Sequence, residues 1–212
     1  MPASPASTTS RGRATRERIL AATAQLVAER GFHSVGVSDI GAAAGVSGAA
    51  LYRHFETKTA ILVELFEGAV DGLLRQAVEL EAGPSGAPGE VLERLIAAHV
   101  EFALAERATL AVYARDSHDL PDVDRRRLRR MQRQYVEIWA RQVASLRPEL
   151  GPEAVLARVE AVFGLLNSAP DLARSLDDDV IGPQMRAMAE AALRVAPPIA
   201  EPAAGGSRGS IG

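Results

Sequence analysis

Hydrophobic residues recur every three to four positions along most of this chain, which is the spacing of one face of an α-helix. In chain order, the periodic segments are residues 15–29, 38–44, 48–55, 57–80, 90–105, 108–117, 121–146, 153–168 and 180–196. No convincing stretch alternates apolar and polar residues as a half-buried strand does. The pattern therefore predicts an all-α fold of about nine helices.

Segments rich in Gly, Pro, Ser and Thr separate or flank these helices and suggest how the chain is organised. Residues 1–14 and 197–212 have the composition of a disordered arm and a disordered tail. Between them, we expect a small domain of three helices at residues 15–58 and a larger helical domain at residues 59–196.

Composition excludes several classes of protein. The chain of 212 residues contains no Cys, so it has no disulfide framework, Cys-ligated zinc or thiol nucleophile. Its longest uncharged run, Ile40 to Tyr52, is 13 residues long and too short to span a membrane. The first 14 residues lack the apolar core of a secretory signal. We therefore expect a cytoplasmic protein with no membrane partner.

Charge is distributed unevenly along the chain. Residues 1–58 hold seven basic and four acidic residues, whereas the remainder holds 17 basic and 23 acidic ones. A basic first part before an acidic second part suggests a nucleic-acid-facing end. A solvated helix face would give the same signal.

Residues 37–55 combine two short predicted helices with a glycine between them. Gly45 permits a sharp turn, and Gly41 stands where the two helices would cross closely. This arrangement is typical of a helix-turn-helix unit, whose second helix enters the major groove of DNA with its N-terminus first. A plain hairpin of two helices is the alternative, because helix-Gly-helix segments are common.

A wider set of residues favours the DNA-binding interpretation. The set consists of Gly31-Phe32, Ser38-Asp39-Ile40, Ala44-Gly45-Val46-Ser47, Leu51-Tyr52, His54-Phe55 and Lys58. Together they resemble the TetR family of transcriptional regulators over about residues 15–62. Over the rest of the chain the resemblance rests on the number and order of the helices. It implies a dimeric repressor that binds a palindromic operator and is released by a small hydrophobic effector.

The resemblance carries a set of DNA-binding residues onto this chain. They are Ser38, Ser47, Gly48, Ala49, Tyr52, Arg53, His54 and Lys58. Tyr52, His54 and Lys58 are expected to contact phosphates, and Ser38 to cap its helix and touch the DNA backbone. Arg53 can read guanine through O6 and N7. Arg11 and Arg13 are expected either to enter the minor groove or to lie in a solvated arm.

The family also places a ligand pocket inside the second domain. Its candidate lining residues are Phe66, His99, Phe102, Tyr113, Trp139 and Asn167. Asp116, Met131 and Tyr135 are further candidates for its wall. Such a set suits a large, mainly hydrophobic ligand. The arginine-rich run at residues 125–130 either solvates its helix or receives an anionic group, such as the phosphates of an acyl-CoA.

The helix at residues 153–168 is apolar on nearly every face. Together with the last helix, it is expected to form the interface between two copies of the chain in a homodimer. The candidate contacts are Val159, Val162, Phe163, Met185 and Met188. The alternative is a central helix that is fully buried within a monomer.

Two other functions are alternatives to a ligand-responsive repressor. An architectural DNA-binding protein would not need so large an apolar second domain. An all-α enzyme is disfavoured, because no metal-ligand spacing, Gly-rich phosphate loop or nucleophile elbow is present. We therefore expect no catalytic residue, no metal and no cofactor.

Overall fold

The computed structural model describes residues 5–84 and 89–194, without the side chains of residues 5–10. In these residues the regular structure is helical throughout. The helices are α1 (Pro5–Arg30), α2 (Val37–Ala44), α3 (Gly48–Tyr52), α4 (Lys58–Ala82), α5 (Glu90–Ala105), α6 (Arg107–Asp116), η1 (Ser117–Asp119), α7 (Asp122–Leu146), α8 (Pro152–Leu166), α9 (Ala169–Leu172) and α10 (Asp178–Arg194).

The all-α prediction is confirmed, and each of the nine predicted helices is present. The described residues add a single turn of 3₁₀-helix, η1, and the one-turn helix α9. Elements this short carry too few residues for a periodic pattern to be recognised.

The prediction of a disordered arm at residues 1–14 is wrong from Pro5 onwards, because α1 begins there. Proline is tolerated in the first turn of a helix, where its missing N–H group is not needed. The remaining arm residues, 1–4, and the predicted tail at residues 197–212 lie outside the described residues.

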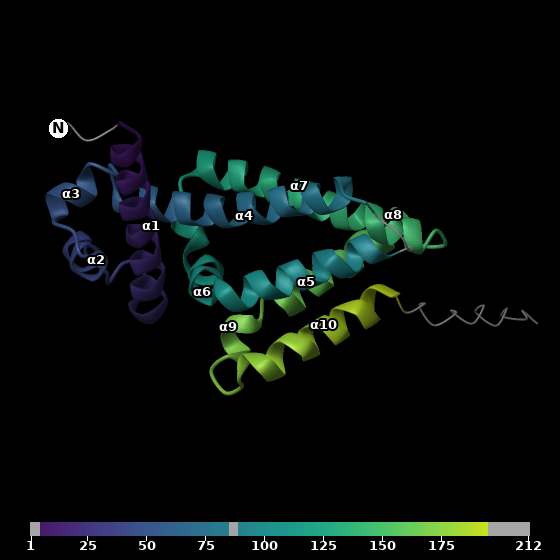
Figure 1. Ribbon diagram of the computed structural model, residues 1–212. Helices are drawn as coiled ribbons and strands as arrows, with labels where there is room; N and C mark the ends of the chain where they lie inside the picture. The colour runs from purple at the N-terminus through teal and green to yellow at the C-terminus, as the bar shows by residue number, and fades with distance from the viewer. Residues whose placement is uncertain (1–4, 85–88, 195–212) are drawn as a thin grey trace, which may run out of the picture.

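The helices form two connected bodies with α4 passing between them (Figure 1). Helices α1 to α3 gather at one end, where α1 packs against α2, α4 and α6. Helix α4 runs from this end alongside α7, while α10 packs against α5 and α8.

Each body has its own hydrophobic core. The core of the first body continues beyond the predicted boundary at residue 58, through Phe66 of α4 to Val112 of α6 and Leu128 of α7. The larger core joins α4, α5, α7, α8 and α10. Buried side chains of α4 and α6 therefore connect the two bodies and pack against α1.

Candidate nucleic-acid interface and internal cavity

The turn between α2 and α3 depends on two glycines. Gly45 adopts φ 66°, in the left-handed region that a side chain disfavours. At Gly41 the backbone of α2 lies so close to the following turn that an added Cβ atom would lie 2.9 Å from the carbonyl oxygen of Val46. The predicted close crossing of α2 and α3 is therefore present.

Of the two serines in this unit, only Ser47 caps a helix. The hydroxyl of Ser47 accepts a hydrogen bond from the Ala50 N–H group at 3.2 Å and so caps α3. Ser38 does not cap α2, contrary to the prediction. Helix α2 begins one residue earlier, and the Asp39 carboxylate accepts from the Gly36 N–H group at 2.8 Å.

The predicted DNA-contacting side of α3 is open to solvent. Tyr52 is 56% exposed, and Ser47, Ala49 and Arg53 are also exposed. Gly48 and His54 are half-buried, while Leu51 on the opposite side is fully buried. The exposed side could therefore meet the edges of bases without any rearrangement of the core.

Lys58 at the start of α4 has partners within the protein. Its ammonium group donates to the carbonyl oxygens of Phe32 at 2.8 Å and Val35 at 2.9 Å, and lies 4.2 Å from the centre of the Phe32 ring. These contacts fix the loop between α1 and α2 to α4. The phosphate contact of Lys58 stays a prediction. The geometry shows that Lys58 also has a structural role.

Sequence reasoning missed Arg16 of α1. Its guanidinium group pairs with Glu64 of α4, donates to the His54 carbonyl oxygen at 2.6 Å and lies 4.2 Å from the centre of the Phe55 ring. The hydrogen bond to Glu64 raises the pKa of Arg16. Arg16 therefore joins α1, the end of α3 and α4, and no spacing within the sequence indicates this contact.

A cavity of about 230 Å³ lies within the second body, and we call it the inner cavity. Five of the six predicted effector residues line it, namely Phe66, His99, Phe102, Tyr113 and Asn167. Asp116 and Met131, also expected in the wall, do not line it. The wall does include Tyr135, as expected, together with Gln132 and Phe163, which the sequence did not indicate. Their long-range side-chain contacts become evident only once α5, α7 and α8 are packed together.

Trp139 does not line the inner cavity, contrary to the prediction. Its side chain is fully buried, with its ring centroid 4.9 Å from that of Phe163 and 5.9 Å from that of Tyr135. It lies one layer behind the wall, because Tyr135 and Phe163 occupy the intervening positions. Trp139 therefore supports the cavity wall instead of facing a ligand.

His99 is a buried polar group of the cavity wall. Its Nδ1 atom lies 3.0 Å from the Tyr135 hydroxyl oxygen, and its Nε2 atom lies 3.2 Å from the Asn167 Oδ1 atom. Burial lowers the pKa of His99 to about 4, although the Asn167 hydrogen bond acts in the opposite direction. The imidazole is therefore neutral at pH 7. Burial likewise raises the pKa of Tyr135.

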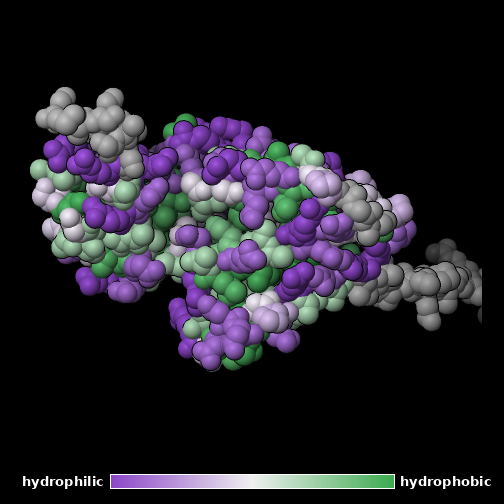
Figure 2. Space-filling model, in the orientation of Figure 1, coloured by the Kyte–Doolittle hydropathy of each residue, from purple (hydrophilic) through white to green (hydrophobic). Residues whose placement is uncertain are grey.

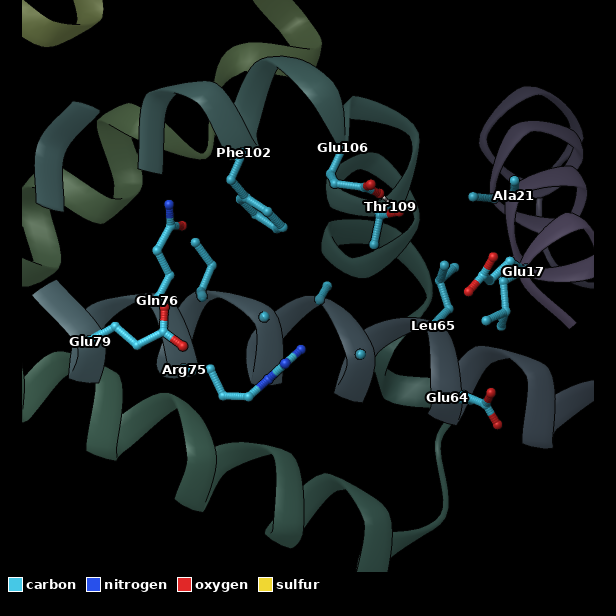
Figure 3. A pocket seen from close by; sticks show the side chains of 16 residues that line it. Glu17, Ala21, Glu64, Leu65, Arg75, Gln76, Glu79, Phe102, Glu106 and Thr109 are labelled. Carbon is cyan, nitrogen blue, oxygen red and sulfur yellow. Dashed lines mark hydrogen bonds between the residues drawn. The ribbon is translucent and has the colours of Figure 1, made fainter. Parts of the chain in front are cut away.

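An open cleft of about 610 Å³ adjoins the inner cavity, and we call it the outer cleft. It lies between α1, α4 and the ends of α5 and α6, and shares Ala69, Leu73, Phe102 and Thr109 with the inner cavity (Figure 3). Hydrophobic surface is visible in this central part of the molecule (Figure 2). The acidic residues around the cleft are Glu17, Glu64, Glu79 and Glu106.

Helix α6 connects the inner cavity to the first body. The Tyr113 ring in the cavity wall lies 5.2 Å from the Phe66 ring of α4. Two residues later, Arg115 donates to the carbonyl oxygens of Val27 and of Ala28, the latter at 3.3 Å, near the C-terminal end of α1. The cavity wall and the helix that supports α2 and α3 are therefore joined by direct contacts.

Most of the predicted dimer contacts are wrong, because their side chains point into the subunit. Val159, Val162, Phe163 and Met185 are all buried within the subunit, and only Met188, 45% exposed, is available to a partner. The outward apolar residues on α8 and α10 include instead Leu156 and Val180, each 47% exposed. Because α8 is apolar on nearly every side, its sequence does not show which side faces inward.

Neither a metal site nor a membrane-spanning helix is found in the described part of the chain. Residues 5–84 and 89–194 contain no group of three or more His, Cys, Asp or Glu side chains placed to hold a metal ion. Within the same residues, no helix is long and apolar enough to cross a membrane.

A helix-turn-helix unit joined to a helical domain with an internal cavity is the architecture of a DNA-binding regulator. Comparison with known proteins identifies the family. Residues 19–65 match the model of bacterial regulatory proteins of the tetR family, and residues 85–170 match that of the tetracyclin repressor-like C-terminal domain. The chain belongs to the TetR family of transcriptional regulators.

Individual relatives agree with this assignment. The chain is 34% identical over 110 residues to the HTH-type transcriptional repressor KstR2 of Rhodococcus jostii, a match that covers 51% of this chain and 53% of that protein. The chain thus spans about half the length of the first curated relatives that it matches.

Solved structures show the same fold over more of the chain. The regulator PfmR of Thermus thermophilus is 25% identical, with a TM-score of 0.70 and coverage of 84% of this chain and 97% of that one. AibR, solved in complex with isovaleryl coenzyme A and operator DNA, is 18% identical, with a TM-score of 0.66 and coverage of 82% and 97%. The latter likeness concerns the fold alone.

Proposed function

We propose that this protein is a ligand-responsive transcriptional repressor that binds a palindromic operator as a homodimer. A small hydrophobic molecule in the inner cavity releases it from DNA. The observation that carries this proposal is the direct connection between cavity and DNA-binding unit, through Arg115 of α6 and the Val27 carbonyl oxygen of α1. The protein acts in the cytoplasm, on the nucleoid when bound, and performs no catalysis.

On DNA, the exposed side of α3 reads bases. Arg53 reads a guanine, while Tyr52 and His54 contact phosphates that fix the position of α3 in the major groove. Arg11 and Arg13 lie in helix α1, so they contact DNA only if the N-terminal part of this helix lies close to the duplex.

Dimerisation uses the outward faces of α8 and α10. Leu156, Val180 and Met188 provide the exposed large apolar side chains for a contact between two copies. An isologous contact of this kind relates two α3 helices by a two-fold axis, as a palindromic operator requires. The two α3 helices must then lie about 34–36 Å apart, or a multiple of this distance.

The effector binds in the inner cavity and shifts the two α3 helices to a spacing that does not fit the operator. It releases DNA only to the extent that it binds the DNA-incompetent state more tightly. An acyl group suits the apolar wall, and the named ligand of AibR supports an acyl-bearing effector for this fold. The alternative function is an architectural DNA-binding protein with no effector.

The test of the DNA-binding part uses fluorescent double-stranded DNA carrying a selected operator. We expect binding to weaken with salt, with a log–log slope of about −0.9 for each phosphate contact. Arg53→Ala should cost about 1–3 kcal/mol on the operator and relax the preference at one base pair per half-site. Equal weakening on every sequence would make Arg53 a phosphate contact, and no retention of any duplex would refute the proposal.

A further inference from the structure

We propose that the inner cavity binds an uncharged, mainly apolar ligand with one hydrogen-bond-accepting oxygen, such as a ketone or an ester, and that the Tyr113 hydroxyl group donates to this oxygen. The inference rests on the proposed function, because it specifies the effector of the same cavity. It follows from the charges, the hydrogen bonds and the volume of the cavity and from the charges of the cleft beside it.

The wall of the inner cavity offers nothing to neutralise an anion. Among the described residues that line it, none is Lys or Arg, and the one carboxylate is that of Glu160. His99 is the remaining ionisable group that could become a cation, and burial keeps it neutral at pH 7 by lowering its pKa. A carboxylate or phosphate taken into this cavity would lose its hydration without gaining a counter-ion. The buried part of the ligand is therefore uncharged.

The hydrogen bonds of Tyr113 indicate what the ligand must present. The Gln132 Nε2 atom donates to the Tyr113 hydroxyl oxygen at 2.8 Å, so this oxygen already acts as an acceptor. The phenolic hydrogen then remains for donation. Tyr113 lines the cavity, and an acceptor oxygen within an otherwise apolar ligand would satisfy this hydrogen.

The polar groups on the other side of the wall are arranged differently. His99 uses one ring nitrogen with Tyr135 and the other with Asn167, so both nitrogens have partners before a ligand arrives. A ligand could engage His99 only by displacing one of those partners. Tyr113 can therefore donate to a ligand with less rearrangement than His99.

The outer cleft disfavours anions along one approach to the cavity. Figure 3 shows Phe102 extending from α5 toward α4 in this cleft, with Glu106 beside it and Glu17 and Glu64 toward α1. Arg16 offsets Glu64, and Arg13 offsets Glu17. The lining also contains the cation Arg75, which pairs with Asp71, whereas Glu79 and Glu106 add negative charge at the same opening. A ligand that approaches past Phe102 thus meets a predominantly acidic surface, which repels carboxylates and phosphates.

The volume of the inner cavity limits the size of the ligand. At about 230 Å³, the cavity is smaller than the roughly 300–1,000 Å³ typical of sites for drug-sized ligands. A short chain or a small ring system fits, whereas a whole acyl-CoA molecule would have to leave its phosphates and nucleotide outside. The arginine-rich run of α7 is not fully available to hold them, because Arg125 pairs with Asp122 and Arg127 with Glu67.

The experiment measures the binding of four matched probes to the full-length protein by calorimetry. The probes share one chain length and differ at one end: a methyl ketone, a carboxylate, a primary ammonium and an alkane. We expect the ketone to bind most tightly. Tyr113→Phe keeps the ring and removes the hydroxyl group, and it should weaken ketone binding roughly 3- to 10-fold, as expected for one neutral hydrogen bond. Alkane binding to the same variant serves as the control and should not change.

Each other outcome contradicts the inference. Tighter binding of the carboxylate or the ammonium would show that the cavity prefers a charge. Equal weakening of ketone and alkane by Tyr113→Phe would show a packing effect in place of a hydrogen bond. Failure of all four probes to bind would show that the cavity does not accept an apolar chain. Operator binding, measured in parallel without any probe, tests the proposed function separately.

Discussion

At the scale of single residues, two helical glycines have opposite surroundings. A Cβ atom at Gly41 of α2 would lie 2.9 Å from the Val46 carbonyl oxygen, whereas one at Gly68 of α4 would have no neighbouring atom within 4 Å. Gly41→Ala should therefore lower the free energy of unfolding by about 1–3 kcal/mol, the usual cost of overpacking. Gly68→Ala should raise it by up to about 1 kcal/mol, because alanine favours a helix.

Chemical denaturation of both variants tests this pair. If Gly41→Ala were as stable as the wild type or more stable, α2 and α3 would not cross as closely as described. The Gly68→Ala control shows whether an exposed helical alanine behaves normally in this chain.

His99 should make stability depend on pH. Its pKa is about 4 in the folded protein, against 6.5 for an ordinary histidine. Between these values the unfolded chain binds a proton that the folded protein does not, so stability is lost as the pH falls. The loss between pH 7 and pH 5 should be about 2 kcal/mol. Denaturation at both pH values should show this loss for the wild type and a smaller one for His99→Gln. An equal loss in both proteins would contradict the burial of a neutral His99.

Lys58 should contribute to stability as well as to any DNA contact. Lys58→Met keeps the length of the side chain but removes the two hydrogen bonds to the Phe32 and Val35 carbonyl oxygens. We expect a loss of about 1–3 kcal/mol in the free energy of unfolding. Unchanged stability would contradict the structural role. The salt slope of DNA binding decides the phosphate contact separately, because loss of one contact flattens it by about 0.9.

Most residue-scale expectations that depended on local geometry could be drawn from the sequence. Gly45 and Gly41 mark the turn and the crossing because their neighbours in space are also neighbours in the chain. The partners of Arg16, Lys58 and Arg115 could not be predicted, because each contact joins segments far apart in sequence.

At the scale of helices, α8 and α10 decide how two copies meet. Leu156→Glu with Met188→Glu places charges on the outward face, so we expect a folded monomer where the wild type is a dimer. Val159→Glu places a charge in the subunit core and should unfold the protein instead. Sedimentation and circular dichroism distinguish the two results. A wild-type monomer at micromolar concentration, or a double variant that stays dimeric, would contradict the proposed face.

The sequence allowed the helices to be predicted better than their orientations. Periodicity located nine helices, α1 to α8 and α10, because each has an apolar face of its own. It did not show which side of α8 faces the core, since Leu156 and Val159 are equally apolar. The family resemblance placed Trp139 at the cavity wall, and spacing along α7 does not show that Tyr135 and Phe163 lie in front of it.

Across the whole molecule, we expect the inner cavity and the DNA-binding unit to be coupled through α4 and α6. Phe66 of α4 and Tyr113 of α6 contact each other at the cavity, while Arg115 holds the end of α1. A ligand that moves α6 must therefore alter the support of α2 and α3. Reciprocity requires operator DNA to change ligand affinity by the same factor by which ligand changes operator affinity.

The most direct test is a titration of the ketone probe into the protein with and without saturating operator. We expect operator to weaken probe binding by the same factor by which the probe weakens operator binding. Typical coupling between two sites gives a factor of about 5 to 150. Arg115→Met removes the contact with α1 and should reduce this factor, while each ligand alone still binds. If a probe that occupies the inner cavity binds equally well with and without operator, the cavity and the DNA-binding unit are not coupled.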